Sequence, residues 1–152
     1  MFRILCVLCA ISWSQSAWAD ASVSEKIKYY SVSGKTVDAI KANMKKKGPK
    51  GYWAYTEWYV KWTGSCKVSV SVTYTMPKLK SGAPADVKSK FDKMYKKLLK
   101  HEKNHGNNGI SAAKEIAKKK CNGGDAILAK YNKKDIAYDK KTDHGYSEGV
   151  KF

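Results

Sequence analysis

A His-Glu-x-x-His segment at residues 101–105 is the part of the sequence whose residue types and spacing best suit chemistry. On an α-helix, residues i and i+4 lie on the same face, so the imidazoles of His101 and His105 can bind one metal ion. Glu102 would then lie beside the metal, where it can accept a proton from a water molecule that the metal activates. Because a match of three fixed positions can arise by chance, the surrounding sequence has to support it.

Apolar residues precede this segment at the spacing of an amphipathic helix. These steps predict a helix from about residue 85 to 105, with both histidines on its buried side. A lone histidine there would more often be a hydrogen-bonded core residue, but two of them with a glutamate between favour a metal site. Steps of three or four residues connect Val87, Phe91, Met94, Leu98, His101 and His105.

The segment Gly106-Asn-Asn-Gly109 leaves the end of this helix open. Its two glycines weaken a helix, which favours an end near His105. Gly109, Ala112 and Ile116 nevertheless continue the apolar series, which favours a helix that extends to about residue 119.

A catalytic zinc ion usually has three protein ligands, so the motif leaves one ligand to be found. One known arrangement places Gly three and His six residues after the second histidine, but those positions hold Asn108 and Ser111. Glu115 could bind only if the chain reversed after the motif, because in a continuous helix it would lie about 15 Å along the axis from the second histidine. His144 is the remaining histidine, and we predict it as the third ligand.

The N-terminal residues have the features of a secretory signal peptide. Arg3 precedes an apolar run that ends in Ala17-Trp18-Ala19, so we predict a signal peptide over residues 1–19 that is cleaved after Ala19. The remaining 133 residues (152 minus 19) suit a single domain and contain no apolar run long enough to cross a bilayer. We therefore expect a periplasmic or secreted protein.

The cysteines agree with export. Cys6 and Cys9 belong to the predicted signal peptide, which leaves Cys66 and Cys121 as an even pair. An oxidising compartment favours a disulfide between them over zinc ligation by thiolates.

The chain is strongly basic, with 30 Lys and Arg residues against 13 Asp and Glu residues and a net charge of +17. Arg3 is the only arginine, so the predicted mature chain carries +16 (29 minus 13). Such a charge attracts acidic polymers, although lysines that only solubilise exposed faces are the more frequent case. Without arginine for bidentate phosphate contacts we expect no specific nucleic-acid partner, and acidic peptides are the first ligands to test.

Period-two patterns predict a β-hairpin ahead of the motif. Residues 66–76 alternate apolar and polar, and residues 52–62 are rich in aromatic and β-branched residues. We also predict a strand at residues 28–32, a helix that Thr36 caps, and a short helix near residues 125–132 followed by a polar tail.

The mature sequence resembles a bacterial family of unknown function that is described as predicted secreted zinc-dependent proteases. The family pairs the histidine motif with a late Thr-x-His-Gly segment, which corresponds to Thr142-Asp143-His144-Gly145 and supports His144 as third ligand. Family members commonly have Gln-Gly-Ala near the end, whereas this chain has Glu148-Gly149-Val150, a difference that we expect not to touch the ligands. The resemblance rests on the segments YYSVSGKTVDAIKANMKKKGP, WAYTEWYVKW, CKVSVSVTYTMP, HEKNH and TDHGYSEG, which span nearly all of the mature chain.

These features predict a zincin-like α+β domain over residues 20–152, with a small antiparallel sheet packed against the motif helix and a second helix. We expect a metallopeptidase in which His101, His105 and His144 bind Zn²⁺ and Glu102 is the general base. Tyr146 is a candidate donor to the oxyanion, although a tyrosine that only packs is the more frequent case.

Two alternatives stay open. In a non-catalytic binding module, zinc would stabilise the fold and the lysines would bind anionic polymers of the envelope or nucleic acid. Such a module gains nothing from a glutamate at position 102, so that residue separates the two hypotheses. Hydrolysis of an amide other than that of a protein, such as one in a cell-wall peptide, is the second alternative.

Overall fold

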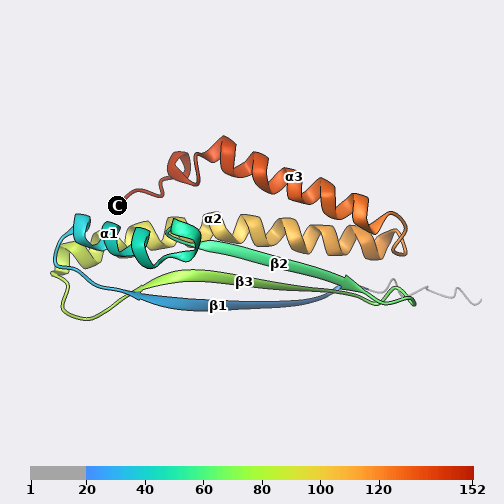
Figure 1. Cartoon of the computed structure of the whole chain (residues 1–152), viewed down its shortest axis with the longest axis horizontal. Coiled ribbons are helices and arrows are strands. Elements are labelled where there is room, and N and C mark those ends of the chain that lie inside the picture. The colour runs from blue at the N-terminus through green and yellow to red at the C-terminus, as the bar shows by residue number, and fades with distance from the viewer. Residues whose placement is uncertain (1–19) are drawn as a thin grey trace, which may run out of the picture.

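The computed structural model describes residues 20–152, which form three layers (Figure 1). The predicted signal peptide (residues 1–19), with Cys6 and Cys9, lies outside the described residues. The elements are β1 (Ser22–Val32), α1 (Val37–Lys47), the 3-10 turn η1 (Pro49–Gly51), β2 (Tyr55–Trp62), β3 (Val68–Leu79), α2 (Ala85–Lys118), α3 (Gly124–Thr142) and the 3-10 turn η2 (Tyr146–Glu148). The sheet is one layer, α2 covers one of its faces, and α3 lies on the side of α2 away from the sheet.

The described sheet is mixed, with strand order β1-β3-β2. The predicted hairpin is confirmed: β2 pairs antiparallel with β3. On the other side β1 pairs parallel with β3, so the prediction of an antiparallel sheet is wrong for this strand. An alternating pattern predicts which residues face the core but not the direction of the neighbouring strand. β1 also begins at Ser22, earlier than the predicted residue 28. Its first eight residues are all exposed and mostly polar, so no buried apolar run marks them as a strand.

The core lies between α2 and the inner face of β3. Every member of the predicted apolar series on α2 is buried, including both histidines of the motif. The opposing side chains on β3 are nearly inaccessible, with Tyr74 and Val72 only 1% exposed. Packing against this face fixes the rotation of α2 about its axis, which turns the histidines inward.

The helix α2 continues without interruption through Gly106–Gly109 to Lys118. Both glycines let the helix approach the sheet closely. A Cβ atom at Gly106 would collide with the Tyr74 hydroxyl, and one at Gly109 would collide with the Trp58 ring. The same residues that weaken an isolated helix are therefore needed where this helix meets two large aromatic side chains.

The helix α3 extends to Thr142, well past the predicted end near residue 132. Its buried residues are few, namely Gly124, Ile127 and Thr142. Its contacts with α2 along the second half are polar, so no apolar periodicity marks this part of the helix. The segment expected to be a polar tail thus forms the outer wall of the site described below.

The predicted disulfide is confirmed, with Cys66 and Cys121 bonded and their Cα atoms 5.7 Å apart. It joins the β2–β3 turn to the α2–α3 turn, which lie at the same end of the molecule (Figure 1). None of the helices formed by residues 20–152 is long and apolar enough to span a membrane.

Candidate metal centre

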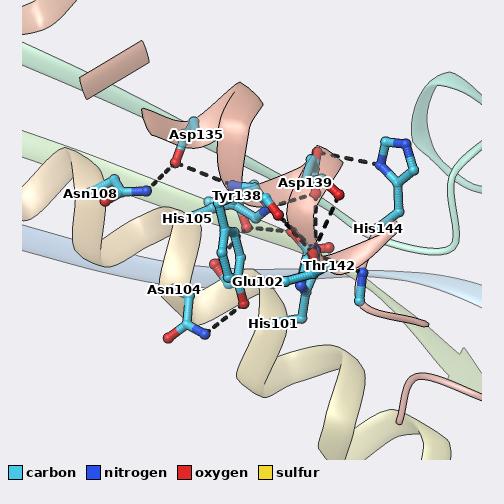
Figure 2. Close-up of polar contacts among 12 residues, drawn as sticks. His101, Glu102, Asn104, His105, Asn108, Asp135, Tyr138, Asp139, Thr142 and His144 are labelled. Atoms are coloured by element: carbon cyan, nitrogen blue, oxygen red, sulfur yellow. Dashed lines mark hydrogen bonds and ion pairs between the residues drawn. The ribbon is translucent and has the colours of Figure 1, made fainter. Parts of the chain in front are cut away.

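Three donor atoms from two helices converge on one point (Figure 2). The Nε2 atoms of His101 and His105, both on α2, are 3.3 Å apart. Each lies 3.1 Å from Oδ1 of Asp139, which comes from α3. Both histidines are buried, at 3% and 9% exposure. These residues could hold a metal ion.

The spacing of the three donors fits a tetrahedral metal site. Ligand atoms bound to zinc at about 2.0–2.1 Å in tetrahedral geometry lie roughly 3.3 Å from one another. The three observed separations are 3.1, 3.1 and 3.3 Å. Two imidazoles and one carboxylate are also a ligand set that leaves a position open for water or substrate.

Each of the two histidines has a carboxylate next to its Nδ1 atom. The Nδ1 atom of His101 is 2.8 Å from Oε2 of Glu148, and that of His105 is 3.2 Å from Oδ1 of Asp135. If each Nδ1–H donates to its carboxylate, both neutral rings present an Nε2 lone pair to Asp139. Three acceptors at such short distances repel one another unless a cation, either a metal ion or added protons, lies among them. The donor set therefore fits a metal ion.

The supporting carboxylates are themselves held in place. Asp135 accepts hydrogen bonds from Trp58 Nε1 at 2.8 Å and from Asn108. Glu148 accepts a hydrogen bond from the Tyr138 hydroxyl at 2.7 Å. The Tyr138 ring also stacks on His101, with ring centroids 5.0 Å apart. Residues from β2, α2 and α3 thus fix the orientation of both imidazoles.

Hydrogen bonds shift the pKa values of the groups around the donors. Burial alone would lower the pKa of His105, but the hydrogen bond to Asp135 and the negative charges of Asp135 and Asp139 raise it overall. Burial alone would raise the pKa of Glu148, but its bonds with Tyr138 and His101 lower it overall. The raised pKa of His105 and the lowered pKa of Glu148 each favour a negatively charged carboxylate that accepts a hydrogen bond from a ring N–H.

Glu102 follows His101 on α2 and lines the same cavity. Its carboxylate accepts a hydrogen bond of 2.6 Å from the Thr56 hydroxyl on β2. Burial raises the pKa of Glu102, while this bond and the two histidines oppose the rise without cancelling it. A carboxylate with a raised pKa is a better proton acceptor than an exposed one.

His144 lies beside the three donors but outside their group (Figure 2). Its Nδ1 atom is 3.4 Å from Oδ2 of Asp139, the oxygen that faces away from the other histidines, and its side chain is 55% exposed. Its role as a metal ligand stays a prediction. Glu115, weighed earlier as a ligand, instead pairs with Lys130 and Tyr131 at the far end of α2.

The donors open into a cavity of about 510 Å³. His144 and Tyr146, both predicted site residues, line it together with the motif. Tyr146 is 55% exposed, with the Lys151 ammonium 4.3 Å from its ring centre. Its proposed hydrogen bond to an oxyanion stays a prediction.

Sequence reasoning found the motif but missed Asp135, Tyr138, Asp139 and Glu148. The first three could have been found from their spacing. Tyr138 and Asp139 follow Asp135 by three and four residues, and Thr142 comes three residues after Asp139, so all four would lie on one face of a helix. The expectation that the segment at Glu148 does not touch the ligands is wrong, because Glu148 contacts His101 directly.

Comparison with known proteins agrees with the resemblance seen in the sequence. No curated protein and no solved structure matches the chain. Residues 27–145, which include the motif and Asp139, match the model of a family described as "Bacterial protein of unknown function (DUF922)". Since this match covers 119 of the 152 residues (145 minus 27, plus 1), the chain belongs to the DUF922 family of bacterial proteins.

Proposed function

We propose that this protein is an exported, zinc-dependent peptidase with a zincin-like site. The observation that carries the proposal is the convergence of His101, His105 and Asp139 in a cavity that also holds Glu102. Two histidines and a carboxylate bind either zinc or iron(II) in enzymes. The glutamate that follows the first histidine favours zinc and hydrolysis, because it supplies a base beside the donors.

The roles of the residues follow from their positions. Zinc bound at this site would polarise the peptide carbonyl and make a water molecule more acidic. Glu102 accepts the proton of the attacking water and later passes it to the leaving amine. Thr56 fixes the direction in which the Glu102 carboxylate points, through its hydrogen bond of 2.6 Å. Glu148 and Asp135 keep the Nε2 atoms of the two histidines directed at the donor centre.

Replacement of Glu102 by Gln tests this mechanism. The variant keeps the size of the side chain but cannot accept a proton at neutral pH. General-base contributions are about 10²- to 10⁴-fold, so hydrolysis of a mixed peptide library should fall by at least that factor. Zinc content, measured by elemental analysis, should not change, because none of the three donors is altered.

Glu57→Gln is the matched control, since the same chemical change occurs on an exposed residue of β2. Its hydrolysis rate and zinc content should equal those of the unaltered protein. A Glu102→Gln variant that cleaves at the full rate would refute the assignment of the base. Elemental analysis that finds iron in place of zinc would refute the choice of metal.

A non-catalytic binding module is the second candidate, and the charge of +16 on the predicted mature chain favours it. In that case the metal would have four protein ligands and no exchangeable position. X-ray absorption of the zinc-loaded protein distinguishes the two, because only an open site changes its coordination when a small inhibitor such as a hydroxamate is added.

A further inference from the structure

The cavity beside the donors has an apolar rim. Among residues 20–152, three of the seven exposed large hydrophobic residues line this one cavity. They are Ile136 at 72%, Tyr146 at 55% and Tyr52 at 45% exposure. Each comes from a different segment: α3, η2 and the loop that precedes β2. Exposed apolar side chains that cluster around one opening indicate a binding surface, whereas scattered ones do not.

Acidic residues are concentrated in the lining of this cavity, whereas the chain as a whole is basic. The chain has 29 lysines, yet in the part that the structure describes none of them lines the cavity. Glu102, Asp135, Asp139 and Asp143 do line it. Two lysines lie just outside the lining, since the Lys50 ammonium hydrogen-bonds to the Tyr55 hydroxyl at 2.6 Å and the Lys151 ammonium is 4.3 Å from the Tyr146 ring centre. These lysines and a bound zinc ion would offset the carboxylates, so the apolar rim is the feature that discriminates between side chains.

We propose that the cavity selects peptides by a large apolar side chain next to the bond that is cleaved. This inference rests on the proposed peptidase function. Peptides with a large apolar residue therefore take the place of acidic peptides as the first ligands to test. The net charge pointed to acidic peptides, but that charge is spread over the surface. Burial of an apolar side chain against the rim supplies affinity that a polar or charged side chain does not.

Ile136 is positioned to make the most direct contribution. It follows Asp135, which supports His105, and lies on α3 one turn before Asp139, so its side chain stands close to the reacting centre. An isoleucine with 72% of its surface exposed gains free energy when a ligand covers it. Its replacement should weaken ligand binding without disturbing the core, since it packs little in the free protein.

The test is direct binding of peptides to the zinc-loaded Glu102→Gln protein, in which the ligand stays intact. Fluorescently labelled heptapeptides of Gly and Ala carry Leu, Ser, Lys or Glu at the central position, and anisotropy gives each Kd. We expect the Leu peptide to bind about tenfold or more tighter than the Ser peptide, and more tightly than the Lys and Glu peptides. Equal binding of all four, tightest binding of Glu, or no binding at all would overturn the inference.

Ile136→Ser in the same background should weaken binding of the Leu peptide by about three- to tenfold and leave the Ser peptide unchanged. Tyr59→Ser is the control, because Tyr59 is 63% exposed on β2 and does not line the cavity. An equal effect of the two replacements would also overturn the inference. Selective binding by a protein that cleaves none of these peptides in its unaltered form would uphold it and count against the peptidase proposal.

Discussion

Each histidine of the candidate metal centre uses its two ring nitrogens for different tasks. In His101 and His105 the Nε2 atom faces the shared donor centre, while the Nδ1 atom faces Glu148 or Asp135. Such carboxylates fix the tautomer and raise the basicity of the ligating nitrogen. The site is therefore built from two carboxylate–histidine pairs plus Asp139, and we expect its affinity for a metal ion to depend also on Glu148 and Asp135, which are not among the three donors.

Replacing Glu148 tests this dependence. Glu148→Ala removes the partner of His101 Nδ1 and should reduce zinc affinity by about 10- to 100-fold, as is typical for residues that support a ligand. Glu148→Gln still offers an oxygen to the ring N–H, so its effect should be smaller. Competition with a chromophoric chelator measures both affinities. Glu57→Ala is the control, and an Ala variant at position 148 with unchanged affinity would contradict the prediction.

The third ligand is tested by two replacements. Asp139→Asn should lose most of the bound zinc, because Oδ1 of Asp139 lies 3.1 Å from both histidine donors. His144→Ala should have the smaller effect, because His144 contacts only the other oxygen of that carboxylate. Zinc content of the two dialysed proteins is the measurement. If His144→Ala lost the metal and Asp139→Asn retained it, the ligand set predicted from the sequence would be the right one.

At the level of the elements, the site lies where a well-packed helix meets a poorly packed one. The motif helix α2 carries twelve buried residues along its length, whereas α3 carries three. The helix α2 supplies both histidines and Glu102, while α3 supplies Asp139 and its neighbours through polar contacts. A metal ion between them would compensate for the few apolar contacts of α3.

The sequence allowed prediction of α2, the hairpin and the disulfide because each leaves a periodic or pairwise pattern. It did not reveal Asp139, because the face of α3 that meets α2 is made of Asp, Tyr and Thr, which resembles an exposed surface. The direction of β1 was missed for a related reason, since its partner is β3 and not the strand that follows it in the chain. Polar interfaces and strand order depend on tertiary contacts that local patterns do not encode.

The close contact of α2 with the sheet gives a prediction for Gly109. Gly109→Ala should improve helix propensity by about 1 kcal/mol, but the added methyl collides with the Trp58 ring. Overpacking typically costs about 1–3 kcal/mol, which equals or exceeds the gain from helix propensity. We therefore expect Gly109→Ala to leave the free energy of unfolding unchanged or to lower it. Urea denaturation of Gly109→Ala and of Asn107→Ala, an exposed position two residues earlier, measures the difference. Equal stabilisation by both would show that the contact is unimportant.

For the molecule as a whole, charge is separated between the surface and the cavity. Of the 13 acidic residues, four line the cavity and a fifth, Glu148, supports a histidine from behind it. Carboxylates gathered in this way attract a divalent cation despite the positive net charge. The positive charge of the lysines elsewhere on the surface disfavours association between molecules.

The disulfide also acts on the whole molecule, because it joins the turn beside the sheet to the turn between the two helices. Cys66 and Cys121 are 55 residues apart, and closing a loop of that length stabilises the fold by about 4 kcal/mol in the chain-entropy model. The Cys66→Ser/Cys121→Ser double variant should lose stability of that order in urea denaturation.

Intact-mass measurement of the exported protein should place its first residue at Asp20 and show a gain of two hydrogens on reduction. Two thiols that react with an alkylating agent before reduction would show that the bridge does not form. A double variant of unchanged stability would show that the bridge does not stabilise the fold.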